Sequence, residues 1–264
     1  MTTKTIKTIL FASLMVAMIL PFSGIMMAEA APNENVNNKA IEDYNKHASN
    51  GEIILPGGFG WVHPSELKYI DSDKSIDENA KNGIDRKFMV EKDGKTILNI
   101  SAMKDDTNLN KLDPSVNYPA LSTYNQVALK HETNSMTYFN GFWVVPDAPV
   151  SFSGGTIYTF NAMQPWDQVI LQPILQYGNT GVCGDLGANW AMVPIIYAEW
   201  GTIAIGDCTI VNEGDLIRGT IVRDSSYVWT VSMEDYNIPG SSDSVQVIYY
   251  GDMSDSLVAL ETYG

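Results

Sequence analysis

The chain has 264 residues and a formal net charge of −15, from 31 acidic and 16 basic side chains. An acidic excess of this size argues against nucleic acid and anionic membrane surfaces as partners. Because only 18% of the residues are charged and 45% are hydrophobic, the chain is not a disordered acidic tail either.

The first thirty residues have the pattern of a secretory signal peptide. Lys4 and Lys7 precede an apolar run from Ile9 to Met27, and Ala28-Glu29-Ala30 supplies a cleavage site of small residues. A proline and a glycine interrupt the run, which favours cleavage over an uncleaved membrane anchor. We therefore expect residues 1–30 to be removed and the mature protein to be secreted, with no membrane attachment.

Residues 31–118 are predicted to form a separate N-terminal region. The region begins with a polar segment, expected to be loose or a short helix. It also contains a hairpin over residues 88–98, in which Asp93-Gly94 predicts a type I′ turn. The polar stretch from Asp105 to Pro119 is typical of a linker. We place a boundary near residue 118 and expect the region before it to pack less tightly than residues 119–264.

Many short strands with turns between them follow this boundary. They predict an all-β fold, an antiparallel β-sandwich or jelly roll with an α+β or irregular N-terminal extension. The predicted strands are Tyr138–Pro146, Thr156–Met163, Val169–Gly178, Asn189–Val193, Ile195–Trp200, Leu216–Val222, Tyr227–Met233, Val245–Tyr250 and Leu257–Glu261.

The strand Val169–Gly178 is apolar almost throughout, yet it carries two glutamines. Alternation puts Gln172 and Gln176 on one face, and Leu171, Leu175 and Tyr177 are on the other. A buried amide must find hydrogen-bond partners or cost free energy. Either the glutamine face lines a wet groove, or it presents an amide to a substrate.

The two cysteines, Cys183 and Cys208, are expected to form a disulfide, because an exported chain reaches an oxidising compartment. The three histidines are far apart and have no ligand spacing, so we expect neither a metal nor another cofactor. The sequence contains no nucleophile elbow and no P-loop. Any hydrolytic chemistry would therefore depend on carboxylates and amides.

The order of several segments resembles the glutamic peptidases, or eqolisins, which are secreted acid endopeptidases with a concanavalin-like β-sandwich. The resemblance covers about half of the chain. Phe142–Pro146 looks like the family's early strand, which ends in Val-Pro, and Val169–Gln172 looks like its Ile-Leu-Gln strand. Val211–Ile217 looks like the family's Gly-Asp turn, and Leu257–Glu261 looks like its late apolar strand, which ends in the catalytic Glu.

This resemblance implies that Glu261 is the general base and that a glutamine amide stabilises the oxyanion. The family has an aromatic residue five positions after its catalytic Gln, which Tyr177 matches if that Gln is Gln172. However, Ile174–Gly178 also resembles the Ile-Leu-Gln-x-Gly form of the motif, so Gln176 stays as the alternative. The candidate substrate-binding residues are Gln176, Tyr177, Trp190 and Asn161.

Two functions remain open at this point. The first is a secreted glutamic-peptidase-like acid endopeptidase that acts on polypeptides, with residues 31–118 as a propeptide-like segment, since family members are made with one. The alternative is a non-catalytic sandwich that binds glycans or cell-surface polymers through its glutamines and an exposed aromatic ring. We expect a monomer in either case. The two are distinguished by whether Glu261 and a glutamine amide converge on one face.

Overall fold

The computed structural model describes residues 34–57, 60–105, 123–150, 152, 154–165, 169–198 and 202–263. Residues 33–264 form one compact unit. The predicted signal peptide and most of the predicted linker lie outside the described residues.

Strands dominate the described part of the chain. Its helices are α1 (Glu34–Ser49), α2 (Ile76–Ala80) and α3 (Ile100–Lys104), with short 3₁₀ turns at Pro64–Glu66 and Arg86–Phe88. Its strands are β1 (Ile53–Leu55), β2 (Gly60–Val62), β3 (Lys68–Ile70), β4 (Met89–Lys92), β5 (Lys95–Asn99), β6 (Thr123–Met136), β7 (Tyr138–Val144), β8 (Thr156–Gln164), β9 (Val169–Gly178), β10 (Trp190–Ala198), β11 (Thr202–Ile205), β12 (Thr209–Val211), β13 (Leu216–Arg223), β14 (Val228–Asp235), β15 (Ser242–Ile248) and β16 (Met253–Tyr263).

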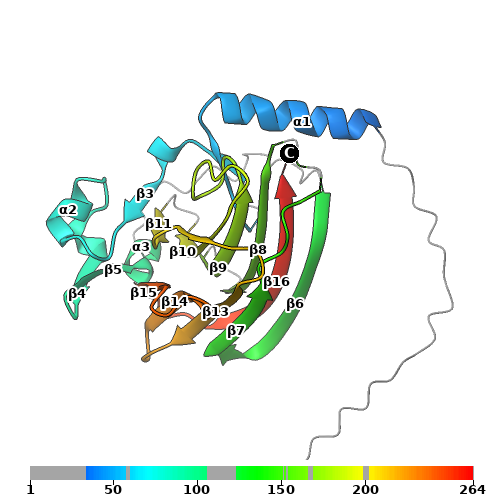
Figure 1. Cartoon of the computed structure of the whole chain (residues 1–264). Coiled ribbons are helices and arrows are strands. Elements are labelled where there is room, and N and C mark those ends of the chain that lie inside the picture. Colours follow the sequence, from blue (N-terminus) through cyan, green and yellow to red (C-terminus); the bar gives the residue numbers. More distant parts are fainter. Residues whose placement is uncertain are drawn as a thin grey trace, which may run out of the picture. The chain divides into compact units, whose positions relative to one another are not determined.

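These strands build a β-sandwich, which confirms the predicted all-β class (Figure 1). Within the described residues, the larger sheet has eight strands in the order β3-β11-β10-β9-β8-β16-β6, with β12 also paired to β10. The smaller sheet has the order β4-β5-β15-β14-β13-β7, and β1 and β2 form a separate pair. Most neighbours are antiparallel, but β3 and β5 from the N-terminal extension pair in parallel with β11 and β15.

Apolar side chains cover both faces of the eight-stranded sheet. Toward the smaller sheet, Leu171 of β9 belongs to the same buried cluster as Trp229 and Val231 of β14. On the opposite face, Ile170 and Ile174 of β9 cluster with residues of β1. All ten residues of β9 are buried, and burial on both faces is why this strand is apolar at nearly every position rather than at alternate ones.

Strand β10 corrects the sequence prediction of two strands separated by Pro194. The chain runs through this residue as one strand, and Pro194 lies opposite Pro173 of β9. A proline has no N–H to donate, so it is tolerated where the neighbouring ladder is broken. The β8–β9 pairing is interrupted between Phe160↔Ile174 and Met163↔Leu171, beside Pro173. On the other side of Pro194, β11 has ended and β12 has not yet begun.

The N-terminal extension is α+β and takes part in the main core. The predicted hairpin is present as β4 and β5, and Asp93 and Gly94 have φ values of 54° and 76°, as a type I′ turn requires. Leu98 and Ile100 are fully buried in the core between the sheets. The described residues before 106 therefore contribute to the core, instead of forming the loosely packed region that the sequence predicts.

Candidate active site

Three polar side chains of the eight-stranded sheet lie in one cross-strand row. Glu261 of β16 pairs with Tyr158 of β8, and Tyr158 pairs with Gln176 of β9. Paired residues point to the same face of a sheet, so the three side chains share the face that β1 covers. Two strand spacings put the Cα atoms of Glu261 and Gln176 about 10 Å apart. We call these residues the Glu–Tyr–Gln row.

The backbone of β16 aims Glu261 at this face. Leu257 and Ala259 alternate inward with Glu261, whereas Val258 and Leu260 between them are exposed. The pairing with β6 shifts register between Leu260 and Glu261. Such bulges redirect side chains and are common beside active sites.

The Glu261 carboxylate is buried and receives two hydrogen-bond donors. The Gly57 N–H lies 3.2 and 3.0 Å from its two oxygens, and the Tyr263 hydroxyl donates to Oε2 at 2.9 Å. Burial raises the pKa of Glu261 above its ordinary value, and the two donors offset part of that rise. A raised carboxyl pKa is common at sites where one group acts first as base and then as acid.

The Gln176 amide is held by the loop that follows β9. Its Oε1 accepts the Cys183 N–H at 2.9 Å, and its Nε2 donates to the Gly184 carbonyl oxygen at 3.3 Å. Gly181 lies directly against the amide, because a Cβ atom there would clash with it. The loop therefore fixes which way the amide points, and one N–H of Nε2 is not used by Gly184.

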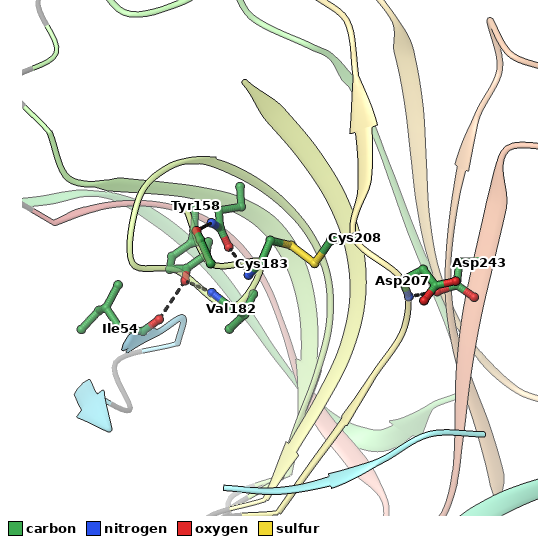
Figure 2. The surroundings of a disulfide bond; sticks show 9 residues. Ile54, Tyr158, Val182, Cys183, Asp207, Cys208 and Asp243 are labelled. Atoms are coloured by element: carbon green, nitrogen blue, oxygen red, sulfur yellow. Dashed lines mark hydrogen bonds between the residues drawn. A yellow bond between two sulfur atoms is a disulfide. The ribbon is translucent and has the colours of Figure 1, made fainter. Parts of the chain in front are cut away.

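A disulfide anchors this loop. Cys183 and Cys208 are bonded with their Cα atoms 5.7 Å apart, which confirms the predicted pairing (Figure 2). The bond ties the loop after β9 to the segment before β12. Because the Cys183 N–H also holds Gln176, the disulfide fixes one partner of the amide.

Tyr158 occupies the middle of the row. Its hydroxyl donates to the Ile54 carbonyl oxygen at 2.8 Å and accepts the Val182 N–H at 3.0 Å (Figure 2). Burial raises the pKa of Tyr158 well above its ordinary value of 10.0, so the hydroxyl stays protonated. Sequence reasoning missed this residue, because Tyr158 alternates with Phe160 and Ala162 in a pattern typical of a core face.

Residues 53–57, which we call the covering segment, cross the row. Ile54 is fully buried and donates its N–H to the Thr180 carbonyl oxygen at 2.9 Å. Three residues later the chain turns at Gly57, whose φ of 83° favours glycine, and its N–H meets Glu261. Backbone groups of the covering segment thus bond two of the three side chains of the row.

The register does not bring Gln172 to Glu261. Gln172 shares the face but lies four residues from Gln176, about 13 Å along the strand. It pairs with Ile195, and neither atom of its buried amide has a hydrogen-bond partner in the described part of the chain. The aromatic spacing from Tyr177 favours Gln172 in the sequence, whereas the strand register places Gln176 in the row with Glu261.

The other predicted contact residues also point to the opposite face, toward the smaller sheet. Tyr177 and Trp190 pair across β9 and β10 with ring centroids 4.9 Å apart, and both are buried. Asn161 is buried beside Gly141 of β7, where a Cβ atom would lie 2.9 Å from its Oδ1. These three side chains do not share the face of the row, so the structure does not bring them together with Glu261 and Gln176. Trp190 in particular is not available to stack on a sugar ring.

Two negative findings apply to the residues that the structure describes. No group of three or more His, Cys, Asp or Glu side chains among them is arranged to hold a metal ion. None of their helices has the length and apolar character needed to cross a membrane.

Comparisons with known proteins give a distant likeness in fold. No protein-family model matches the chain, and a search of curated proteins finds no significant match. Among solved structures, scytalido-glutamic peptidase with a transition-state analogue inhibitor is similar at 15% identity and a TM-score of 0.39 over 51% of this chain. SCP-B, an eqolisin in complex with the tripeptide Ala-Ile-His, is similar at 15% identity and a TM-score of 0.36, also over 51% of this chain. The matches span 63% and 61% of those two chains.

Proposed function

We propose that this protein is a secreted acid peptidase of the glutamic type, made in a latent form, which hydrolyses polypeptides. The observation that supports this most is the shared row of Glu261 and Gln176 on one sheet face, with strand β8 between them. At this spacing the carboxyl group can act on the water and the leaving nitrogen of one peptide bond, while the amide binds its carbonyl oxygen. The same pair also remains functional in acid, where a histidine base would be protonated.

The proposed reaction uses only these side chains and water. The Glu261 carboxylate takes a proton from water, and the water oxygen bonds to the carbonyl carbon of the substrate. The carbonyl π electrons move to its oxygen, and the free N–H of Gln176 stabilises the resulting oxyanion. Glu261 then returns the proton to the amide nitrogen as the C–N bond breaks and the carbonyl re-forms.

Latency follows from the covering segment. Gly57 donates to both carboxylate oxygens of Glu261, so a substrate must displace residues 53–57 before it can reach the row. We therefore assign residues 31–118 a propeptide-like role despite their contribution to both sheets. Gln172 has no part in the chemistry under this proposal.

The test compares the mature chain with a Glu261→Gln variant on a denatured protein substrate at acid and at neutral pH. The two side chains have nearly the same shape, so circular dichroism should be unchanged, while hydrolysis in acid should be lost. An Ile54→Asp variant, which places a charge at a buried position of the covering segment, should hydrolyse faster than the parent. Hydrolysis by an Ile54→Asp/Glu261→Gln chain at the rate of the Ile54→Asp chain, or no hydrolysis even by Ile54→Asp, would contradict the proposal.

A further inference from the structure

The amide of Gln176 is a partly occupied donor. Its Oε1 accepts from Cys183, and one N–H of Nε2 is directed to Gly184 at 3.3 Å. Among the described residues its second N–H has no acceptor, so this N–H is the one that can donate to a developing negative charge. A site that stabilises an oxyanion generally aims more than one donor at it. The proposed peptidase therefore needs a second donor close to Gln176.

The Tyr158 hydroxyl has the geometry of such a donor. It lies between Glu261 and Gln176 in the row and is fully buried. The Val182 N–H already donates to its oxygen at 3.0 Å, which leaves its single hydrogen to point elsewhere. That hydrogen is directed at a peptide carbonyl oxygen, that of Ile54, at 2.8 Å. The hydroxyl is thus held in place to bind the carbonyl group of a peptide that crosses the row.

The covering segment shows how an extended peptide fits there. Ile54 gives its carbonyl oxygen to Tyr158 and its N–H to the Thr180 carbonyl, so both of its backbone groups are paired by the sheet side of the site. Further along the same peptide, the Gly57 N–H meets Glu261. A substrate that replaces this segment meets the same donor, with the carboxylate and the amide on either side.

We propose that Tyr158 is a third catalytic residue, whose hydroxyl donates to the carbonyl oxygen of the peptide bond that is cleaved. This inference rests on the proposed peptidase function. When the oxygen of the attacking water bonds to the carbonyl carbon, the π electrons move onto the oxygen that Tyr158 and Gln176 hold. The electrons return to the carbonyl bond when the C–N bond breaks. Glu261 alone carries the proton from the attacking water to the leaving nitrogen. Tyr158 keeps its own proton throughout, as its burial favours.

Two roles for Tyr158 predict opposite results. If its hydroxyl only holds the covering segment, its removal should loosen that segment and increase hydrolysis. If it holds the reacting carbonyl, its removal should slow hydrolysis even when the covering segment is already displaced. The second result is the one we expect.

The experiment uses the mature chain with Ile54→Asp as the displaced background. Turnover and KM on a quenched-fluorescence peptide library in acid are compared with and without Tyr158→Phe. We expect kcat to fall about 10²-fold with little change in KM, since a donor of this kind acts mainly on the transition state. Tyr236→Phe is the matched control, because Tyr236 is exposed, follows β14 of the smaller sheet and contacts Arg218 rather than the row.

The outcomes separate this inference from the proposed function. A kcat for Tyr158→Phe equal to or above that of its background, with Glu261→Gln inactive, overturns the role of Tyr158 alone. An Ile54→Asp chain that hydrolyses nothing overturns both proposals. Circular dichroism and thermal melting verify the fold. If the double variant does not fold, Tyr158→Phe in the unmodified mature chain decides: slower hydrolysis supports the inference and faster hydrolysis overturns it.

Discussion

Gln176 and Gln172 lie four residues apart on one face of β9, and their amides have opposite surroundings. Gln176 is bonded by the backbone of the loop after the strand and shares a row with Tyr158 and Glu261. Gln172 has apolar neighbours, with Ile195 beside it, and both of its amide atoms lack a partner among the described residues. The strand gives both residues the same orientation. What differs is the chain that folds over each end of the face.

This contrast shows where the candidate site comes from. The loop that carries Val182, Cys183 and Gly184 and the covering segment supply the backbone donors and acceptors that the row needs. Both lie outside the sheet strands that carry the row. Paired polar groups are therefore concentrated at the end of the face that carries Gln176. At the end that carries Gln172, a buried polar group lacks these partners and lowers the stability of the fold.

The largest effect should come from removing each glutamine in turn. Gln176→Ala should lower the rate of hydrolysis about 10²–10³-fold, because an oxyanion donor is lost. Gln172→Ala should lower it less than about 10-fold, since the side chain lies about 13 Å away along the strand. Kinetics in the Ile54→Asp background measure both. A larger loss from Gln172→Ala would reverse the assignment.

Removing the disulfide should weaken the end of the face that carries the row. Replacing Cys183 and Cys208 with Ser opens a loop with a sequence separation of 25 residues, which in the chain-entropy account costs about 3.5 kcal/mol of unfolding free energy. Denaturant titration of the double variant measures this. An unchanged stability would mean that the loop and its hold on Gln176 do not depend on the bond.

Filling the other end with an apolar side chain should stabilise the fold. Gln172→Met has a similar volume and removes an unpaired buried amide, so the unfolding free energy should rise by about 1–2 kcal/mol. The matched variant Gln176→Met should have the opposite sign, because it leaves the Cys183 N–H without its acceptor. If both variants change stability in the same direction, the contrast between the two glutamines does not hold.

The smallest effect concerns the pH dependence that Glu261 contributes. Its pKa in the folded state is raised above the ordinary value of 4.5, so the folded state holds this proton more tightly than the unfolded state does. Relative to Glu261→Gln, the parent chain should lose stability as pH rises from the ordinary value through the raised one. Below the ordinary pKa of Glu261, both states are protonated and this loss of stability does not occur. Denaturant titrations across acid pH measure the difference, and a constant difference would contradict it.

Much of the fold was predictable because it is local. Alternation identified most strands of the sandwich, Asp93-Gly94 identified a hairpin, and the exported context paired Cys183 with Cys208. The continuity of β10 was missed, because a proline usually ends a strand and the break that tolerates Pro194 lies in a neighbouring strand.

The candidate site was less predictable, because it depends on register. Alternation places Glu261 and both glutamines on faces, but it does not say which residue of one strand lies opposite which residue of the next. The row needs three strands in register, and β8 ends at Gln164 whereas β16 begins only at Met253. The strand pairings identify Tyr158 as a member of the row, and the position of the covering segment identifies Gly57 as a partner of Glu261; neither follows from the sequence.

The facing prolines also matter before the sheet exists. Residues 169–178 and 190–198 are uncharged and mostly apolar, which is the composition of segments that stack with copies of themselves into fibrils. Pro173 and Pro194 lie at the middle of these two segments, and each removes one backbone donor from every layer of such a stack. Strand β8 and the gap between β11 and β12 accommodate the missing N–H groups in the folded sheet, but an intermolecular stack has no such gap. We therefore expect the two prolines to disfavour aggregation of these two segments while the chain is still unfolded.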